Sequence, residues 1–207
     1  MLNSNSNMLY LYIKRFFDFT FAFLAIWCLG PFILILALLV WVVDGLPIWF
    51  VQVRPGLQAK DFKLIKFRTM KVEPNKGDET QPDLRRISPL GHFLRASHLD
   101  ERPQLINILK GEMSFVGPRP LLKSYLPHYS SEQQKRHLVK PGLTGWAQLH
   151  YTPDMDWVSY FKYDMFYIEH LGWKLDLIIL PRTLAKITKK ESQKPKKGCT
   201  RQPFAKI

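Results

Sequence analysis

The chain has 207 residues, of which 46% are hydrophobic, and it carries a formal net charge of +13. This length favours a single domain with a membrane element, and the charge favours an anionic partner: nucleic acid, anionic lipid or a phosphorylated small molecule. The two cysteines, Cys28 and Cys199, have no Cys or His neighbour at metal-ligand spacing, and one lies in an apolar run and the other in a lysine-rich tail. A zinc site and a disulfide are therefore disfavoured.

A run of 25 residues without a charge extends from Phe19 to Val43. It is long enough to cross a hydrocarbon core of about 30 Å. It is too long for a cleavable signal peptide, and no small-residue cleavage site follows it. Gly30 and Pro31 lie in its middle, where proline removes an intrahelical hydrogen bond and kinks a helix. Each half would reach only about 18–21 Å at 1.5 Å per residue, which is too short to cross.

Basic residues flank this apolar run on both sides, and the positive-inside tendency places both flanks in the cytoplasm. We therefore predict a re-entrant helix-break-helix at Gly30-Pro31 that enters and leaves the membrane by the same face. A kinked helix that spans the membrane is the alternative, because a re-entrant backbone must still satisfy its freed polar groups. The flanking basic residues are Lys14 and Arg15 before the run, and Arg54, Lys60, Lys63, Lys66 and Arg68 after it.

Further along the chain, short elements are predicted from periodicity and turn residues. Residues 48–53 are predicted to form a strand before a turn at 54–56, and residues 62–67 alternate as a half-buried strand does. Residues 73–86 are polar and indicate an exposed loop. Helices are expected at 131–138, at 156–168 and, as an amphipathic helix interrupted by Pro181, at 175–187. The basic tail from residue 188 is expected to be disordered and attracted to anionic lipid.

Two adjacent carboxylates, Asp100 and Glu101, lie where a helix should begin. Pro103 suits a first helical turn, and Gly111 ends the apolar run that follows. The helix dipole would favour the ionised form of Asp100. A carboxylate that stays charged among arginines can hold a divalent metal or attack phosphorus; the simpler interpretation is a helix cap with a solvated neighbour.

Basic and proline-rich motifs surround this carboxylate pair. Arg119 stands between Pro118 and Pro120, which fix its backbone and reduce the entropy lost when the guanidinium binds phosphate through two hydrogen bonds. Residues 140–148 contain two glycines and a proline and are predicted to form a loop. The candidate phosphate-binding and nucleotide-sugar-binding residues are Lys66, Arg68, Arg95, Pro118, Arg119, Pro120 and Gln148.

From about residue 12 to residue 187 the chain resembles the bacterial sugar transferase family, the small monotopic polyprenyl-phosphate phosphoglycosyltransferases. The resemblance implies a mainly helical α+β fold with an N-terminal re-entrant membrane helix. It divides the chain into an N-terminal segment with the membrane helix (1–47), a small membrane-associated catalytic domain with amphipathic interfacial helices (48–187) and a basic tail (188–207). The matching motifs are Lys14-Arg15 with Asp18, the mid-run proline, Gln52–Gly56, Lys66–Met70, Leu99–Leu105, Gly117–Leu122, Arg136-His137 and Pro141–Gln148.

The same resemblance implies an activity. A sugar 1-phosphate would pass from a UDP-sugar, an N-acetylhexosamine or a related sugar, to polyprenyl (undecaprenyl) phosphate, with release of UMP. This would be the first membrane step in assembling a surface glycan such as O-antigen or exopolysaccharide. Asp100 would be the nucleophile that forms an aspartyl-phosphosugar, Glu101 would position the metal or the acceptor, and both would hold Mg²⁺. The enzyme would lie at the bacterial inner membrane with its catalytic domain on the cytoplasmic face.

One departure from the family pattern concerns the sugar. After Gln148 the family often carries Asn-Gly-Arg-Asn, whereas this chain reads Leu-His-Tyr-Thr-Pro. Two alternative functions stay open. One is the same transfer by direct attack without a covalent intermediate. The other is a non-enzymatic basic binding protein anchored to the membrane, which would leave the carboxylate pair unexplained. We expect anionic lipid and the two substrates as partners and no nucleic acid, and the oligomeric state, including a homodimer, is open.

Overall fold

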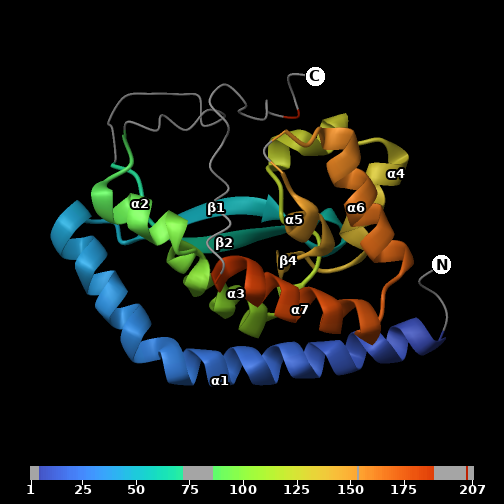
Figure 1. Cartoon of the computed structure of the whole chain (residues 1–207), viewed down its shortest axis with the longest axis horizontal. Helices are drawn as coiled ribbons and strands as arrows, with labels where there is room; N and C mark the ends of the chain where they lie inside the picture. The colour runs from blue at the N-terminus through green and yellow to red at the C-terminus, as the bar shows by residue number, and fades with distance from the viewer. Residues whose placement is uncertain (1–4, 72–85, 153, 189–203, 205–207) are drawn as a thin grey trace.

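The computed structural model describes residues 5–71, 86–152, 154–188 and 204. A long helix, α1 (Asn5–Asp44), comes first, and Figure 1 shows that it bends and partly encloses the rest of the molecule. Its helical conformation continues through Gly30 and Pro31, so the predicted break is a bend and not an interruption. Pro31 has no N–H to donate to the carbonyl of Trp27, which is a sufficient cause of bending. By length and composition α1 is able to cross a membrane, and the re-entrant path stays a prediction.

Both arms of α1 bury side chains in the domain, whereas the stretch between them is partly or fully exposed. The first arm buries one residue in every four, namely Tyr10, Lys14, Asp18 and Ala22. The second arm buries Leu36, Ala37 and Val40. Between them, residues 23–35 include no buried residue, and Trp27 is 77% exposed. A long exposed apolar surface of this kind marks contact with a membrane or another protein.

The predicted strands form an antiparallel hairpin of β1 (Trp49–Pro55) and β2 (Asp61–Phe67), with Trp49 opposite Phe67. The 3-10 helix η1 (Leu57–Ala59) connects them. β1 extends into the residues predicted as a turn. In β2 the buried residues are Phe62, Leu64 and Phe67, which approximates the predicted alternation.

The central helical segment begins with α2 (Pro89–Ala96), which sequence reasoning did not predict. The 3-10 helix η3 (Leu99–Gln104) follows and leads into α3 (Leu105–Lys110). Asp100 and Glu101 lie in the first turn of η3, which confirms the predicted helix start. Gly111, with φ 82°, ends α3 in the left-handed conformation, as the sequence predicted.

A second, two-stranded sheet is parallel and was not predicted. It joins β3 (Ser114–Val116) to β4 (Gly142–Thr144), and α5 (Trp146–His150) follows. The prediction of a loop for residues 140–148 was therefore wrong, because β4 is specified by a partner strand distant in sequence. The backbones of Gly117 and Gly142 lie very close together beside this sheet. A Cβ at Gly142 would lie 2.1 Å from the nitrogen of Gly117, so a larger residue would not fit there.

The C-terminal half is helical. It contains η4 (Lys123–His128), α4 (Ser131–Gln134), η5 (Lys135–Leu138), α6 (Trp157–Glu169) and α7 (Trp173–Thr188). The predicted helices at 131–138, 156–168 and 175–187 are confirmed, except that Pro181 lies within α7 without interrupting it. The predicted loop at 73–86 and the tail lie outside the described residues, apart from Arg86, Thr188 and Phe204. Phe204 packs against Tyr125 and Trp157.

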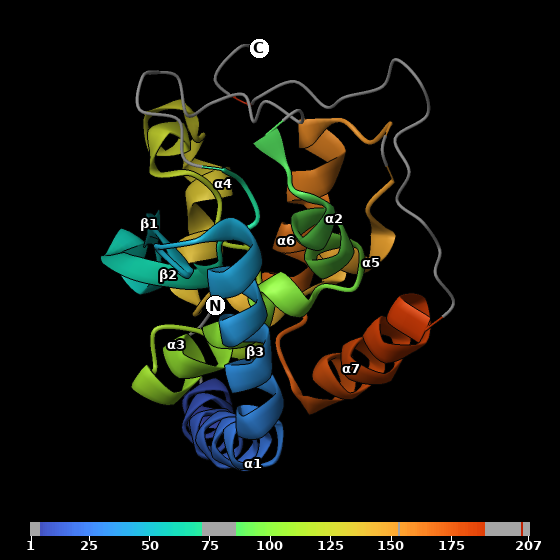
Figure 2. The ribbon, with the colours of Figure 1, turned by 90° about the vertical axis from the view of Figure 1, so that its left-hand side faces the viewer.

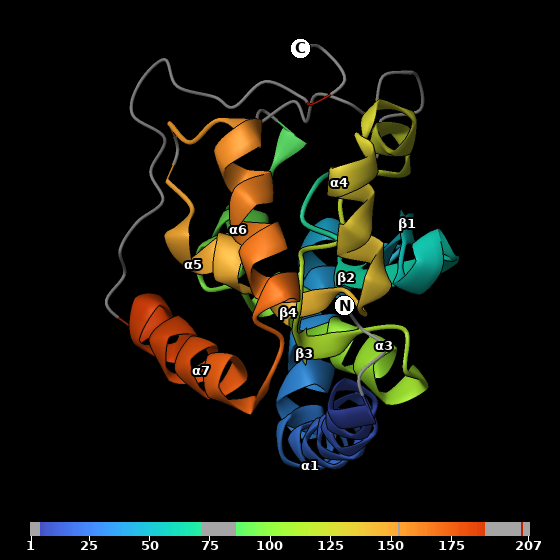
Figure 3. The ribbon, with the colours of Figure 1, turned by 90° about the vertical axis from the view of Figure 1, so that its right-hand side faces the viewer.

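The hydrophobic core attaches both arms of α1 to β2. One cluster joins Ala22 of the first arm to Phe62 and Leu64 of β2, and another joins Val40 of the second arm to Phe67. Figures 2 and 3 show that α1 and α7 lie at the same end of the molecule. The mainly helical α+β fold with one long apolar N-terminal helix is thus confirmed.

Polar contacts complete the docking of the first arm. Lys14 forms an ion pair with Asp176 of α7, and Arg15 donates two hydrogen bonds of 2.6 Å to the last carbonyls of α3. Asp18 accepts the N–H of Phe115 in β3 at 3.1 Å. The positive-inside prediction relied on Lys14 and Arg15 as flanking charges. In the structure these two side chains attach α1 to the domain.

Candidate active site

Glu101 is the point at which three separate elements meet. Its Oε1 accepts a hydrogen bond from Lys66 Nζ at 2.8 Å and another from Arg119 Nη2 at 2.6 Å. Burial alone would raise the pKa of Glu101, but Arg119 and Lys66 outweigh it and hold that pKa well below its usual range. Glu101 therefore stays ionised and orients both cations.

A buried asparagine places η3 beside β2. Asn107 of α3 is fully buried; its Nδ2 donates to the carbonyl of Lys63 at 2.7 Å, and its Oδ1 accepts from the N–H of Ile65 at 3.2 Å. These bonds attach α3 along β2, which brings Glu101 within reach of Lys66. A fully bonded buried amide fixes such a register because a displaced one would leave polar groups unpaired.

The loop that carries Arg119 is held by the parallel sheet. Gly117 donates its N–H to the carbonyl of Thr144 at 2.9 Å, and Gly142 donates to the carbonyl of Pro118 at 2.9 Å. The guanidinium of Arg136 donates to the carbonyl of Arg119 at 2.7 Å. The backbone at Arg119 is thus fixed by tertiary hydrogen bonds in addition to its prolines.

Asp100 differs from its neighbour. It is 8% exposed, and among the described residues its carboxylate forms no hydrogen bond or ion pair. Burial and the adjacent Glu101 raise the pKa of Asp100, while Lys66, Arg119 and Arg95 oppose the rise. The two adjacent carboxylates thus have pKa values shifted in opposite directions, an arrangement that separates a structural role from a reactive one.

The arginines predicted to bind phosphate lie in different places. The Nε of Arg95 donates to Thr69 Oγ1 at 2.7 Å, and the guanidinium is near enough to affect Asp100. Arg68 is buried, and it donates to the carbonyls of residues 44–46 at the end of α1. The structure therefore does not bring Arg68 to the carboxylates; it caps the C-terminus of α1, where the helix dipole favours a cation.

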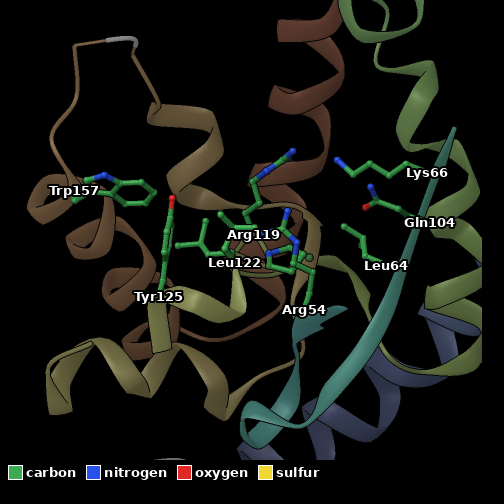
Figure 4. Close-up of a pocket in the computed structure, with 11 residues that line it drawn as sticks. Arg54, Leu64, Lys66, Gln104, Arg119, Leu122, Tyr125 and Trp157 are labelled. Atoms are coloured by element: carbon green, nitrogen blue, oxygen red, sulfur yellow. The ribbon is translucent and has the colours of Figure 1, made fainter. Parts of the chain in front are cut away.

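A cavity of about 190 Å³ lies beside Arg119. Figure 4 shows Lys66 and Gln104 on one side of it, Tyr125 and Trp157 on the other, and Arg119 and Arg54 between them. Sequence reasoning did not select Arg54, Gln104, Tyr125 or Trp157 as site residues. Arg54 could have been selected from the sequence, because it lies in the Gln52–Gly56 motif.

This smaller cavity has an excess of positive charge. Arg54, Lys66 and Arg119 line it. Arg54 donates to Gln52 Oε1 at 2.6 Å, and its Nε is buried without a hydrogen-bond partner in the described part of the chain. Burial and the nearby Arg119 lower the pKa of Arg54 to about 10. Among the described residues, Glu101 forms ion pairs with Lys66 and Arg119, and no carboxylate forms an ion pair with Arg54. Such a site favours a ligand with more than one negative charge, as a diphosphate has.

A second cavity, of about 630 Å³, is lined mainly by apolar side chains from β4, α5, α6 and α7. Glu101, Arg102 and Arg119 also line it, and so does Gln148, whose side chain donates to the carbonyl of Leu143 at 3.1 Å. Arg119, Leu121 and Trp157 line both cavities. Arg119 therefore stands between a cationic space and an apolar one.

The carboxylate pair is suited to a metal that arrives with its substrate. Among the described residues there is no group of three or more His, Cys, Asp or Glu side chains that could hold a metal by itself. Mg²⁺ is commonly bound by one or two carboxylates together with substrate phosphates. Asp100, whose oxygens are not engaged, and Glu101 fit that smaller requirement.

Comparison with known proteins places the chain in a family. Residues 9–190 match the model of a family described as bacterial sugar transferase. The chain belongs to the bacterial sugar transferase family. This sugar transferase is 42% identical over 192 residues to a Bacillus subtilis (strain 168) protein named uncharacterized sugar transferase EpsL, covering 93% of this chain and 95% of that protein.

Two further relatives have names that state substrates. A UDP-glucose:undecaprenyl-phosphate glucose-1-phosphate transferase of Xanthomonas campestris pv. campestris is 37% identical over 185 residues, 84% of this sugar transferase and 38% of that protein. A UDP-N-acetylgalactosamine-undecaprenyl-phosphate N-acetylgalactosaminephosphotransferase of Aeromonas hydrophila is 34% identical over 187 residues, 86% and 44% respectively. The sugar transferase thus spans less than half of these two relatives.

Proposed function

We propose that this sugar transferase moves a sugar 1-phosphate from a UDP-sugar to undecaprenyl phosphate or a similar polyprenyl phosphate, giving the polyprenyl-diphosphate sugar and UMP. The observation that carries the proposal is a buried, unengaged carboxylate, Asp100, whose pKa is affected by Lys66 and Arg119, two of the cations that line the smaller cavity. The names of the relatives from Xanthomonas and Aeromonas support both substrates.

The diphosphate of the nucleotide sugar would bind among Arg54, Lys66 and Arg119. Each cation faces the smaller cavity, and their charge exceeds that of their carboxylate partner. We propose an N-acetylhexosamine or a related hexose as the sugar. The two relatives are named for glucose and for N-acetylgalactosamine, so the sugar differs within this degree of similarity.

In the first step an oxygen of Asp100 attacks the phosphorus that carries the sugar. The new Asp100 O–P bond forms as the bond from that phosphorus to the UMP oxygen breaks, which releases UMP and leaves an aspartyl-phosphosugar. Lys66 and Arg119 stabilise the charge on the transferred phosphoryl oxygens, which is the main task of a phosphoryl-transfer site. Glu101 keeps these two cations in place.

In the second step a phosphate oxygen of the polyprenyl phosphate attacks the same phosphorus. Its new O–P bond displaces the Asp100 oxygen, so the free carboxylate returns and the lipid diphosphate sugar leaves. Mg²⁺, bound through Asp100, Glu101 and substrate phosphates, would neutralise charge that otherwise repels the anionic nucleophiles.

The test is to replace Asp100 by asparagine. Wild-type protein with Mg²⁺ and a UDP-sugar, but no acceptor, should release UMP in an amount limited by the enzyme and should gain the mass of a phosphosugar on the peptide with Asp100. Asp100→Asn should lose both signals and reduce turnover on the order of 10³-fold or more, because a neutral amide is a poor nucleophile. Release of UMP only after acceptor is added, without an adduct, would favour direct attack.

We also propose that the helix α1 is re-entrant and that the catalytic domain faces the cytoplasm. The attachment of both arms of α1 to β2 supports this, since a straight spanning helix would carry one arm away from the domain. In a variant without Cys28 and Cys199, single cysteines at positions 3 and 60 should react equally with an impermeant thiol reagent applied to sealed vesicles of one orientation. Labelling of one position from each side would instead indicate a spanning helix.

A further inference from the structure

We propose that the larger cavity is the binding site of the polyprenyl phosphate and that its prenyl chain enters along α7. This inference rests on the proposed function, because it assigns one of the two substrates to each cavity. The volume of about 630 Å³ lies within the usual range of roughly 300–1,000 Å³ for sites of small ligands.

The lining of the larger cavity matches an amphiphile with one anionic end. Arg102 and Arg119 supply two positive charges near Glu101, while a third cation, Lys186, donates to the carbonyl of Leu149 at 2.8 Å. The other side chains around it are largely apolar, as a hydrocarbon chain requires. The aliphatic and aromatic residues that line this cavity are Phe115, Leu121, Leu143, Leu149, Tyr151, Trp157, Tyr160, Leu180, Leu184 and Ile187.

The cavity meets the exposed apolar face of α7. Leu180, Leu184 and Ile187 line it, yet they are 37%, 65% and 38% exposed. The opposite stripe of α7, with Leu175 and Ile179, is buried in the domain. An exposed apolar stripe on a helix that also exposes basic side chains, here Lys174 and Arg182, is suited to a membrane interface. A prenyl chain could therefore pass from lipid into the cavity without exposure to water.

The position of α7 agrees with such an entry. Figures 2 and 3 show that α7 begins beside the apolar helix α1 and lies with it at the same end of the molecule, and Trp173 and Asp176 of α7 contact Tyr10 of α1. Arg119, at this cavity and at the cationic one, stands where the phosphates of both substrates would meet. The smaller cavity, with Arg54, Lys66 and two aromatic rings, is the more polar of the two and is suited to the nucleotide sugar.

Two leucines of α7 provide a matched experiment. Leu177 and Leu184 are 66% and 65% exposed and lie seven residues apart, hence on nearly the same face of the helix. Leu184 lines the larger cavity, and Leu177 does not. Leu184→Glu and Leu177→Glu should therefore alter membrane binding alike, while only the first places a carboxylate at the cavity.

Steady-state kinetics in detergent micelles with full-length protein would compare these variants. Leu184→Glu should raise the KM for polyprenyl phosphate about tenfold or more relative to Leu177→Glu, since it removes apolar contact and adds repulsion to the phosphate. The KM for the UDP-sugar should stay within twofold. Arg54→Gln should show the reverse selectivity, with a higher KM for the UDP-sugar.

The milder variant Leu184→Gln and a series of prenyl phosphates of increasing chain length give a second measurement. Wild-type protein should prefer longer chains, and Leu184→Gln should reduce that preference because the chain loses part of its apolar site. Equal effects of Leu184→Glu and Leu177→Glu on both substrates, or an effect of Leu184→Glu on the UDP-sugar alone, would overturn the assignment. Lack of turnover by wild-type protein with every UDP-sugar would instead contradict the proposed function.

Discussion

Two arginine–carboxylate pairs in this protein show how similar ion pairs serve different purposes. Arg136 and Asp164 are both 2% exposed and 2.9 Å apart, and the guanidinium lies 5.3 Å from the ring centre of Phe161. In the other pair Glu101 is shared by Lys66 and Arg119, and the side chain of Arg119 is 40% exposed. The first pair is closed and balanced in charge. The second leaves cationic surface available to a ligand.

A hydrogen bond connects the two pairs, one of which supports the fold while the other is available to bind a ligand. Arg136 donates to the backbone carbonyl of Arg119, so the closed pair supports the loop from which the open pair extends. A buried, balanced pair is costly to break, because one charge would be left without compensation. In the open pair, the exposed part of the Arg119 guanidinium can bind a phosphate in place of water. Stability and binding should therefore respond to different substitutions, which the following predictions examine.

The largest effect should come from breaking the closed pair. Arg136→Met should destabilise the protein by about 3–5 kcal/mol, because it removes the guanidinium from a buried ion pair with Asp164. Denaturant unfolding in detergent would measure the loss. Lys135→Met is the control: Lys135 pairs with Glu132, but their side chains are 50% and 56% exposed, so it should cost less than about 1 kcal/mol. Equal stability of the two variants would contradict the comparison.

A smaller effect, on catalysis, should follow from changing the open pair. Arg119→Lys keeps the charge but loses the planar, two-pronged guanidinium, so kcat/KM should fall about 10²-fold, or about 2.7 kcal/mol, with little change in unfolding free energy. Initial rates and unfolding measurements on the same preparation separate the two quantities. Near wild-type rates would show that bulk positive charge is sufficient at this position.

The smallest effect concerns the pH dependence. Burial and Glu101 raise the pKa of Asp100, and Arg95 opposes that rise. The reaction needs ionised Asp100, so activity should be lost as the pH falls through its pKa. Arg95→Gln removes a cation and should move the acid limb of the kcat/KM profile to higher pH, by less than about one unit. Lys110→Gln, which alters an exposed cation of α3, should leave the profile unchanged; a shift in the other direction for Arg95→Gln would contradict this assignment.

Local patterns in the sequence were sufficient to predict several of the elements that carry the site residues. Pro103 indicated the beginning, and Gly111 the end, of the helical segment in whose first turn Asp100 and Glu101 lie, and alternation located β2 with Lys66. These features depend on residues within a few positions of one another. The parallel pairing of β3 with β4 depends on segments far apart, so the sequence of residues 140–148 suggested only a loop.

Lys66 and Arg68 separate what the sequence determined from what the tertiary structure decided. Both are basic residues at the end of β2, and their sequence neighbourhood predicted the same role for each. In the fold, Lys66 binds Glu101 while Arg68 binds the carbonyls at the end of α1. The sequence by itself determined the motifs and those elements that periodicity, caps and turns mark, because these signals act over short range. Only the tertiary structure decided which cations face the cavities, because the partner of a buried charge comes from whichever distant segment packs against it.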